Sequence, residues 1–408
     1  MDDILQYIPS MLSGKELDKK LTVLPTYDKS IIEKSATERL IAMQDIYRIF
    51  IPNSMSREIY SKLYLALLRS LQKKHSILAI RQSNENTKAI RQQAYESILG
   101  GSDSFTILGK SGIGKSSSIS RAINILTEQS VLKLPNTKII PCLQVQTPAD
   151  CSTKGLLLEI LRKADEILST NYYKNAIRSH ATVDMLIGAV SQTSLNHIGL
   201  LIVDEIQNIV TNRSGNTLIG TLIQLINNSG ISICLVGTPE SAIFFEKEQM
   251  LARRTLGLNY AEMAYDDEFR NFCKIILGYS YVKKPIFVDE AMLLWLYQHS
   301  NGNASIVIGL IYNVQEIAIL ENLECLDITT LNITYEKRLK MLHHYIQPQV
   351  IKAGSPKKKI FDSSIHTENT VIADNITIYQ IAMNAKESKQ DIIKELLQNG
   401  ISVEEVVI

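Results

Sequence analysis

The segment Gly109-Lys-Ser-Gly-Ile-Gly-Lys-Ser116 has the residue types and the spacing of a loop that holds phosphate groups. It satisfies the pattern G-x-x-x-x-G-K-[ST] in full, with an apolar run before it and an alcohol-rich helix start after it. Lys115 is expected to reach the β- and γ-phosphates of a nucleotide, and Ser116 its Mg²⁺ ion. Backbone N–H groups and a helix N-terminus would close around the phosphates. The residues expected to shape this cofactor-binding loop are Gly109, Ser111, Gly112, Ile113, Gly114 and Ser117.

A second chemical element is Gly199-Leu-Leu-Ile-Val-Asp-Glu205, an apolar run that ends in two consecutive acids. An ionised pair at the end of a buried strand is costly unless a cation is bound there, and in an open α/β sheet this edge is where ligands lie. Asp204 is suited to hold hydrated Mg²⁺ and Glu205 to polarise the attacking water. Together with the loop, this pair predicts nucleotide hydrolysis.

The nucleotide is expected to be ATP. A GTPase should show an Asn/Thr-Lys-x-Asp motif, whereas Lys163-Ala-Asp165 lacks the preceding Asn or Thr. A kinase would need an acceptor pocket that the sequence does not locate. The sequence therefore favours an ATPase that uses ATP and Mg²⁺.

Two further polar positions follow the next apolar run. Thr238, in Leu235-Val-Gly-Thr-Pro-Glu240, could bind the γ-phosphate or the lytic water through its hydroxyl, although a plain strand-to-turn Thr-Pro stays open. Arg253 and Arg254 end the expected helix Glu248–Arg254, from which an arginine could supply charge to a neighbouring subunit's γ-phosphate. Solvated surface arginines are the alternative.

The elements that position these residues are predicted to be short strands alternating with helices. Strands are expected at Phe105–Leu108, Ile139–Val145, Ile198–Val203 and Ile231–Val236, and the last is preceded by the helix stop Asn227–Gly230. Runs that are apolar on both faces indicate a parallel sheet covered by helices on both sides.

The flanking regions are predicted to be helical. Residues 1–30 are expected to form an extended arm and residues 35–71 helices, with a polar turn at Gln82–Thr87 before another helix. Ala291–Tyr297 and Ile306–Leu320 are expected to be helices. Four parts follow: an N-terminal arm and helical region (1–90), an α/β nucleotide-binding subdomain (91–258), a helical lid (259–345), and a linker and tail for partner docking (346–408).

Bulk composition is that of an ordinary globular protein. The chain has 408 residues, 45% of them hydrophobic, and its 43 Lys and Arg balance 42 Asp and Glu. Any contact with nucleic acid must therefore come from local placement of charge. The five cysteines show no metal-binding spacing, which fits reduced thiols in the cytoplasm, and no apolar run approaches the length of a membrane span.

In order, these motifs resemble an AAA+ ATPase with a P-loop, an N-terminal helical extension and a C-terminal helical lid. The strings LLIVDEIQNI, ISICLVGTPES, EKEQMLARRTLG and DCSTKGLLLEIL further resemble the TnsC/TniB family of transposition regulators, over roughly residues 20–345. The resemblance makes Lys115 and Ser116 the Walker A residues, and Asp204 and Glu205 the Walker B residues. It also places Thr238 at the sensor-1 position, Arg253 at the finger position with Arg254 as substitute, and Lys154 against the DNA backbone.

The resemblance also implies partners. Such ATPases assemble as a hexameric or heptameric ring, or as a helical filament, on duplex DNA, and connect a target-selection protein to transposase subunits. No membrane partner is expected. A replication-type loader, a defence ATPase, and a P-loop kinase without nucleic acid remain the alternatives, and a solvated Lys154 remains the alternative to a DNA contact.

One departure from the AAA+ pattern concerns the lid. The segment Asn301-Gly-Asn-Ala-Ser-Ile306 has no Arg or Lys where a Gly-x-x-Arg is common. The lid should therefore add little charge to hydrolysis, and slow turnover is expected.

Overall fold

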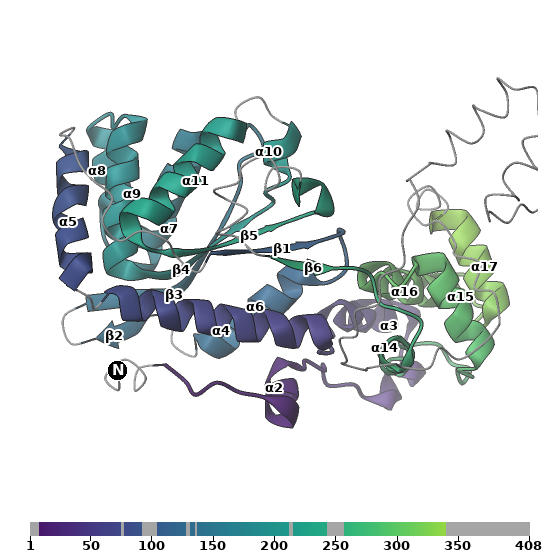
Figure 1. Ribbon diagram of the computed structural model, residues 1–408. Helices are drawn as coiled ribbons and strands as arrows, with labels where there is room; N and C mark the ends of the chain where they lie inside the picture. The colour runs from purple at the N-terminus through teal and green to yellow at the C-terminus, as the bar shows by residue number, and fades with distance from the viewer. Residues whose placement is uncertain are drawn as a thin grey trace, which may run out of the picture. The chain divides into compact units, whose positions relative to one another are not determined.

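A six-stranded sheet forms the centre of the α/β part of the protein (Figure 1). The computed structural model describes residues 8–74, 77–91, 104–127, 131–134, 137–211, 215–242 and 257–339. The strand order is β2-β3-β4-β5-β1-β6, and all neighbours are parallel except β2 and β3. The strands are β1 (Phe105–Gly109), β2 (Leu132–Leu134), β3 (Thr137–Gln146), β4 (Ile198–Asp204), β5 (Ser232–Gly237) and β6 (Leu258–Tyr260).

The four strands predicted from apolar runs are confirmed as β1, β3, β4 and β5. Every residue of β1, β4 and β5 is buried, as expected for central strands covered on both faces. Strands β2 and β6 were not predicted from the sequence. Each is three residues long and lies at an edge of the sheet, so neither carries a readable periodicity.

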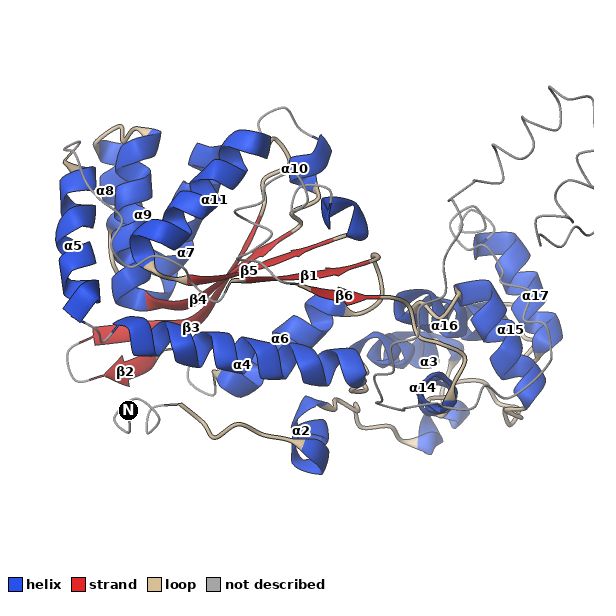
Figure 2. Ribbon diagram, viewed as in Figure 1, coloured by secondary structure: helices blue, strands red, loops and turns tan. Residues whose placement is uncertain are grey.

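Helices cover both faces of the sheet, which confirms the predicted layered architecture (Figures 1 and 2). One face carries α7 (Thr153–Leu168), α9 (Val183–His197) and α11 (Gly215–Ser229). The opposite face carries α4 (Ser54–Lys74) and α6 (Lys115–Leu126). Each layer has its own hydrophobic cluster, and the predicted helix stop is confirmed because α11 ends just before Gly230, whose φ is +60°.

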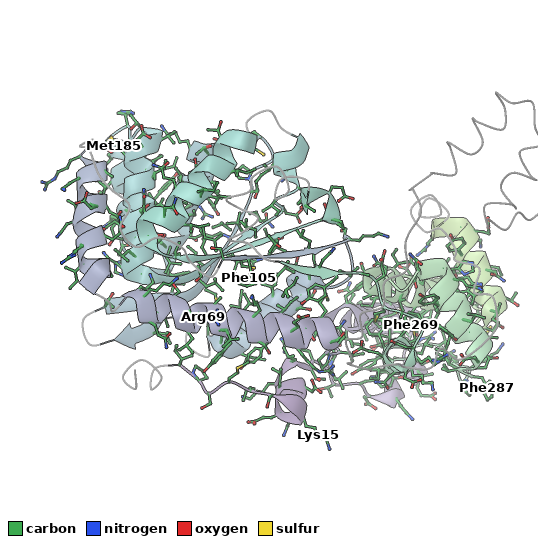
Figure 3. The ribbon with its side chains drawn as sticks, viewed as in Figure 1. Lys15, Arg69, Phe105, Met185, Phe269 and Phe287 are labelled. Carbon is green, nitrogen blue, oxygen red and sulfur yellow. The ribbon has the colours of Figure 1, made fainter. Side chains whose placement is uncertain are left out.

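A separate helical part follows β6. It comprises α14 (Asp267–Leu277), α15 (Glu290–Ser300), α16 (Ala304–Leu320), α17 (Ile328–Thr334) and a π-helical turn (Tyr335–Leu339). Its hydrophobic cluster surrounds Phe269, whereas Phe105 belongs to the cluster between α4 and the sheet (Figure 3). Among the described residues, no single helix is long and apolar enough to span a membrane, although α15 and α16 pass that test as a pair bent by 119°.

The N-terminal region contributes to the hydrophobic cluster of the helical part and to the cluster between α4 and the sheet. It contains α2 (Gly14–Leu21), the 3₁₀ helices η1 (Lys29–Glu33) and η2 (Met43–Arg48), α3 (Ala36–Ala42), α4 and α5 (Ile77–Ile90). Met43, Ile46 and Ile49 pack into the cluster of α14–α17, while α4 packs beneath the sheet. The short elements α8 (Tyr172–Arg178), α10 (Asn208–Thr211) and η3 (Pro239–Ser241) complete the described part.

Two sequence predictions about the N-terminal region are wrong. The extended arm contains α2, whose Leu17 and Leu21 are buried. The polar segment Gln82–Thr87 is not a turn but the middle of α5, because Gln82 is buried and donates from Nε2 to Asn86 Oδ1 at 3.0 Å, one helical turn away. Polar side chains that pair with each other on a helix can be buried at little cost.

Close contact between α5 and α9 depends on Gly188. A Cβ atom at this position would lie 2.9 Å from the backbone N of Ile90. The glycine therefore lets the two helix backbones approach. The predicted linker and tail, residues 346–408, lie outside the described residues.

A buried ion pair ties α3 to the lid. Arg39 donates from Nη1 to Glu324 Oε2 at 2.8 Å and from Nη2 to Glu324 Oε1 at 2.6 Å, and Nη1 also donates to Tyr281 O at 2.8 Å. The Arg39 side chain is 3% exposed. The hydrogen bonds from Arg39 are the main cause of the lowered pKa of Glu324.

We expect Arg39→Met to destabilise the protein by about 3 kcal/mol, because it leaves the buried Glu324 carboxylate without its partner. Chemical denaturation measures this loss. The lowered pKa means that the pair stabilises the fold above the unfolded carboxyl pKa, and that this contribution is lost as the pH falls through the folded pKa. The difference between wild type and variant should therefore narrow in acid.

Arg48→Met is the matched control. Arg48 pairs with Asp45 at 3.0 Å, but its side chain is 74% exposed, so its loss should change stability by less than about 1 kcal/mol. Equal effects of the two substitutions would contradict a stabilising role for the buried pair.

Candidate functional site

The phosphate loop joins β1 to α6 in a conformation that only glycine adopts easily. Gly112 has φ +83° and Gly114 has φ +104°, both in the left-handed region. A Cβ atom on Gly109 would lie 2.5 Å from Ile113 Cδ1 and 2.8 Å from Tyr260 O. The glycines of the motif are thus required by the backbone path of the loop.

Lys115 begins α6 and is 9% exposed. Its Nζ donates to Gly109 O at 2.6 Å and to Lys110 O at 2.9 Å, so its ammonium group lies within its own loop. Burial lowers the pKa of Lys115, and the charges of Asp204 and Glu205 act in the opposite direction. A bound triphosphate would add negative charge here and favour the charged lysine.

Ser116 and Asp204 form the candidate magnesium site. Ser116 Oγ lies 3.4 Å from Asp204 Oδ2, which also accepts from Gln144 Nε2 at 3.3 Å. Asp204 is 6% exposed, and its Oδ1 accepts from the backbone N of Glu205 at 2.9 Å. One hydroxyl and one carboxylate are hard oxygen donors of the kind that Mg²⁺ takes, with water and phosphate completing its shell. No group of three His, Cys, Asp or Glu within the described ranges could hold a metal ion by protein ligands alone.

Glu205 lies beside the pair in a strained backbone conformation. Its φ is +61°, which is unusual for a residue with a side chain and is typical of functional sites. Its carboxylate is exposed and accepts a hydrogen bond from Gln207 Nε2. Glu205 therefore provides an exposed carboxylate directly after the end of β4, beside Asp204.

Thr238 follows β5 and begins the turn that leads into η3. Its hydroxyl donates to the carboxylate of Glu240, and this hydrogen bond is the main cause of the lowered pKa of Glu240. Thr238 is therefore a polar group fixed at the end of the strand between β4 and β1.

These residues line one cavity of about 230 Å³. It collects Lys115, Ser116, Asp204, Glu205 and Thr238 from three strand ends. The other residues that line it are Ser111, Gly112, Gly114, Ser117, Gln207, Gly237 and Ser305. Gln207 and Ser305 were not among the predicted site residues. The sequence could have indicated Gln207 by its position two residues after Glu205. It gives no such indication for Ser305, which comes from the lid.

A second cavity, of about 320 Å³, adjoins the first and shares Gly112, Gly114, Ser117 and Ser305 with it. Most of its other lining residues come from three regions that are distant in sequence: residues 47–57, the first turns of α14, and the start of α16. Apolar groups such as Ile51, Met263 and Ile308 line it. This is a suitable chamber for the base and ribose of a nucleotide whose phosphates occupy the first cavity.

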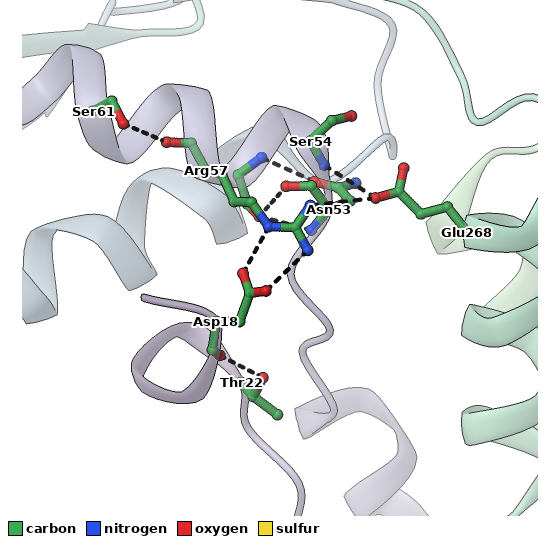
Figure 4. Close-up of polar contacts among 8 residues, drawn as sticks. Asp18, Thr22, Asn53, Ser54, Arg57, Ser61 and Glu268 are labelled. Atoms are coloured by element: carbon green, nitrogen blue, oxygen red, sulfur yellow. Dashed lines mark hydrogen bonds and ion pairs between the residues drawn. The ribbon is translucent and has the colours of Figure 1, made fainter. Parts of the chain in front are cut away.

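Charged side chains connect three segments at the wall of this base cavity (Figure 4). Arg57 of α4 donates from Nε to Asp18 Oδ1 of α2 at 2.6 Å, and its Nη1 lies 3.7 Å from Glu268 Oε1 of α14. Ser54 N also donates to Glu268 Oε1, at 3.1 Å. Arg57 of α4 therefore links α2 and the lid helix α14 next to the base cavity.

Two of the predicted site residues within the described ranges, Gly109 and Lys154, line neither cavity. Lys154 is exposed in the first turn of α7, after the N-cap Ser152. Arg253 and Arg254 lie outside the described residues, so their expected finger role stays a prediction.

The class of protein follows from this arrangement. A phosphate loop after β1, paired acids after β4 and a polar residue after β5, on a parallel sheet followed by a helical lid, is the AAA+ P-loop ATPase fold. Residues 98–242 match the family model described as AAA domain, and AAA domains in general bind and hydrolyse nucleotide with Mg²⁺. Comparison with curated protein sequences gives no match.

Several solved structures are similar to this chain at low sequence identity and low TM-score. Aeropyrum pernix ORC1 in complex with DNA is 13% identical with a TM-score of 0.43, over 64% of this chain and 64% of that one, less than two thirds of its length. Drosophila ORC bound to DNA is 12% identical with a TM-score of 0.44, over 97% and 85%. The Thermotoga maritima RuvB Holliday junction branch migration motor is 14% identical with a TM-score of 0.35, over 86% and 91%.

Filling the base cavity should separate base binding from phosphate binding. Ala304 lines this cavity at the start of α16, so we expect Ala304→Trp to weaken ATP binding by about tenfold or more because the base loses its apolar contacts. Binding of tripolyphosphate should change by less than about twofold. Titration calorimetry measures both ligands.

Lys274→Trp is the control, because Lys274 is exposed on α14 and does not line the cavity. Equal weakening of ATP and tripolyphosphate by Ala304→Trp would contradict the assignment of the two cavities.

Proposed function

We propose that this protein is an ATP-dependent DNA-binding regulator of transposition of the TnsC/TniB type. It assembles on duplex target DNA with ATP bound, links a target-selection protein to the transposase, and disassembles after hydrolysis. The observation that carries the proposal is the cavity in which Lys115, the Ser116–Asp204 pair, Glu205 and Thr238 converge beside a base-sized chamber. The family strings that surround the same residues support the transposition role.

Each residue of the phosphate cavity has a chemical task in this proposal. Ser116 and Asp204 would hold Mg²⁺, which neutralises charge on the phosphates. Lys115 would bind the β- and γ-phosphate oxygens. Glu205, exposed on its strained backbone, would orient and polarise the attacking water, and Thr238 would hold the water or the γ-phosphate.

DNA binding is proposed to rest on backbone contacts. Lys154 is exposed in the first turn of α7, where the helix N-terminus also favours phosphate. Within residues 8–91, Lys and Arg outnumber Asp and Glu, although the whole chain is nearly neutral. Each subunit would offer few phosphate contacts, so stable binding needs an oligomer, which is a ring or a filament.

The oligomer would also complete the catalytic site. Arg253, or Arg254 in its place, is proposed to reach the γ-phosphate of a neighbouring subunit. In the proposed organisation, residues 91–258 bind the nucleotide, residues 259–345 form the lid, and the terminal regions 1–90 and 346–408 meet the partners.

Lys115→Ala and Glu205→Gln should have opposite effects on assembly. Lys115→Ala should abolish ATP binding and DNA-bound assemblies, because the phosphates lose their cation. Glu205→Gln should still bind ATP but hydrolyse it about 10²- to 10⁴-fold more slowly, so its assemblies should persist on DNA. Negative-stain images with and without duplex DNA, combined with a phosphate-release assay, measure both properties.

Wild-type protein with a non-hydrolysable ATP analogue is the positive control. Normal coating of DNA by Lys115→Ala would refute the proposal that ATP binding controls assembly on DNA. Isolated particles of wild type under all conditions would instead favour a solitary enzyme.

Lys154→Ala should weaken DNA binding uniformly across sequences and reduce the slope of log affinity against log salt by about one per subunit. Its affinity for ATP should stay unchanged. Lys174→Ala, at an exposed lysine of α8, is the matched control. Fluorescence anisotropy with labelled duplex at several salt concentrations tests this, and an unchanged slope would make Lys154 an ordinary solvated lysine.

A further inference from the structure

We propose that Asn303 is a neutral clamp that couples the lid to the phosphate loop and sets how long a nucleotide stays bound. This inference rests on the proposed ATPase function and names a positioning residue for it. It begins from contacts between α16 and the loop that involve no charged group.

Asn303 uses both ends of its side-chain amide. Its Nδ2 donates to Ser111 O in the phosphate loop at 2.8 Å. Its Oδ1 accepts from the backbone N–H groups of Ser305 at 3.1 Å and Ile306 at 3.3 Å, which caps the N-terminus of α16. The side chain is therefore fixed at once to the lid helix and to the loop, and the residue is 7% exposed.

Backbone contacts reinforce this link. Ser305 N also donates to Gly112 O, at 3.0 Å. A Cβ atom on Gly112 would lie 2.7 Å from Asn303 Oδ1 and 3.1 Å from Ser305 Cβ, so the lid lies directly against the loop. Ser305 lines both the phosphate cavity and the base cavity. The clamp thus lies where the two cavities meet.

Asparagine suits this position for a chemical reason. Aspartate could cap α16 equally well, but its carboxylate would face the carbonyl oxygen of Ser111 with no proton to donate. Serine could cap the helix but is too short to donate to the loop at the same time. The amide supplies both an acceptor and a donor without adding charge beside the phosphates.

Because Asn303 donates to a loop carbonyl and lines neither cavity, its effect should not depend on the γ-phosphate. The clamp holds the loop and the lid together over whichever nucleotide is bound. Its loss should speed the release of ATP and ADP by the same factor. A residue that contacted the γ-phosphate would instead discriminate between the two.

The test is nucleotide affinity and turnover of full-length Asn303→Asp and Asn303→Ser. In Asn303→Asp, we expect the dissociation constants of ATP and ADP to rise together by about tenfold, with KM raised and kcat within about twofold of wild type. Asn303→Ser should weaken both nucleotides by a smaller common factor. Asp289→Asn, the matched amide–acid exchange at the N-cap of α15, should leave both affinities unchanged.

The outcomes separate the two proposals. Wild-type affinity in both Asn303 variants, a change in ATP binding alone, or a fall in kcat at unchanged KM would overturn the clamp. Wild-type affinity in Asn303→Ser alone would also overturn it, because the effect of Asn303→Asp would then be one of charge. Failure of the wild type to bind ATP, with Lys115→Ala no different, would overturn the proposed function itself.

Discussion

Parallel pairing of β4, β5 and β1 is the constraint on which the candidate site depends. Because parallel strands end at the same edge of a sheet, their pairing brings the phosphate loop, Thr238 and Asp204-Glu205 together. The register is firm, since every residue of these strands is buried between two layers of helices. A shift by one residue would move apolar side chains out of both cores and disperse the polar groups at the edge.

The lid depends on the N-terminal region for much of its structure. Met43, Ile46 and Ile49 complete its hydrophobic cluster, and the Arg39–Glu324 pair fixes α3 to it. The same region continues into α4, which packs beneath the sheet. Arg57 of α4 also connects α2 to the lid helix α14 at the wall of the base cavity. The N-terminal region therefore contacts the lid, the sheet-facing helix α4 and the wall of the base cavity.

Charge within the site is concentrated on the sheet side. Lys115 lies within its own loop, Asp204 is held by hydrogen bonds, and Glu205 is exposed. The lid contributes hydrogen bonds from Asn303 and Ser305 in place of a cation. Ser305, through which the lid reaches the phosphate cavity, is uncharged, in keeping with the small charge expected from the lid sequence.

The sequence by itself determined the central strands, the phosphate loop and the acids after β4, because long apolar runs and a fixed glycine spacing are local signals. Only the tertiary structure showed that β5 lies between β4 and β1, and that Gln82–Thr87 is helical, because a buried Gln82–Asn86 pair cannot be distinguished from a polar turn by pattern. Neither the base cavity nor the Asn303 clamp could be predicted from the sequence. Their residues come from segments far apart in the chain, and packing alone brings such segments together.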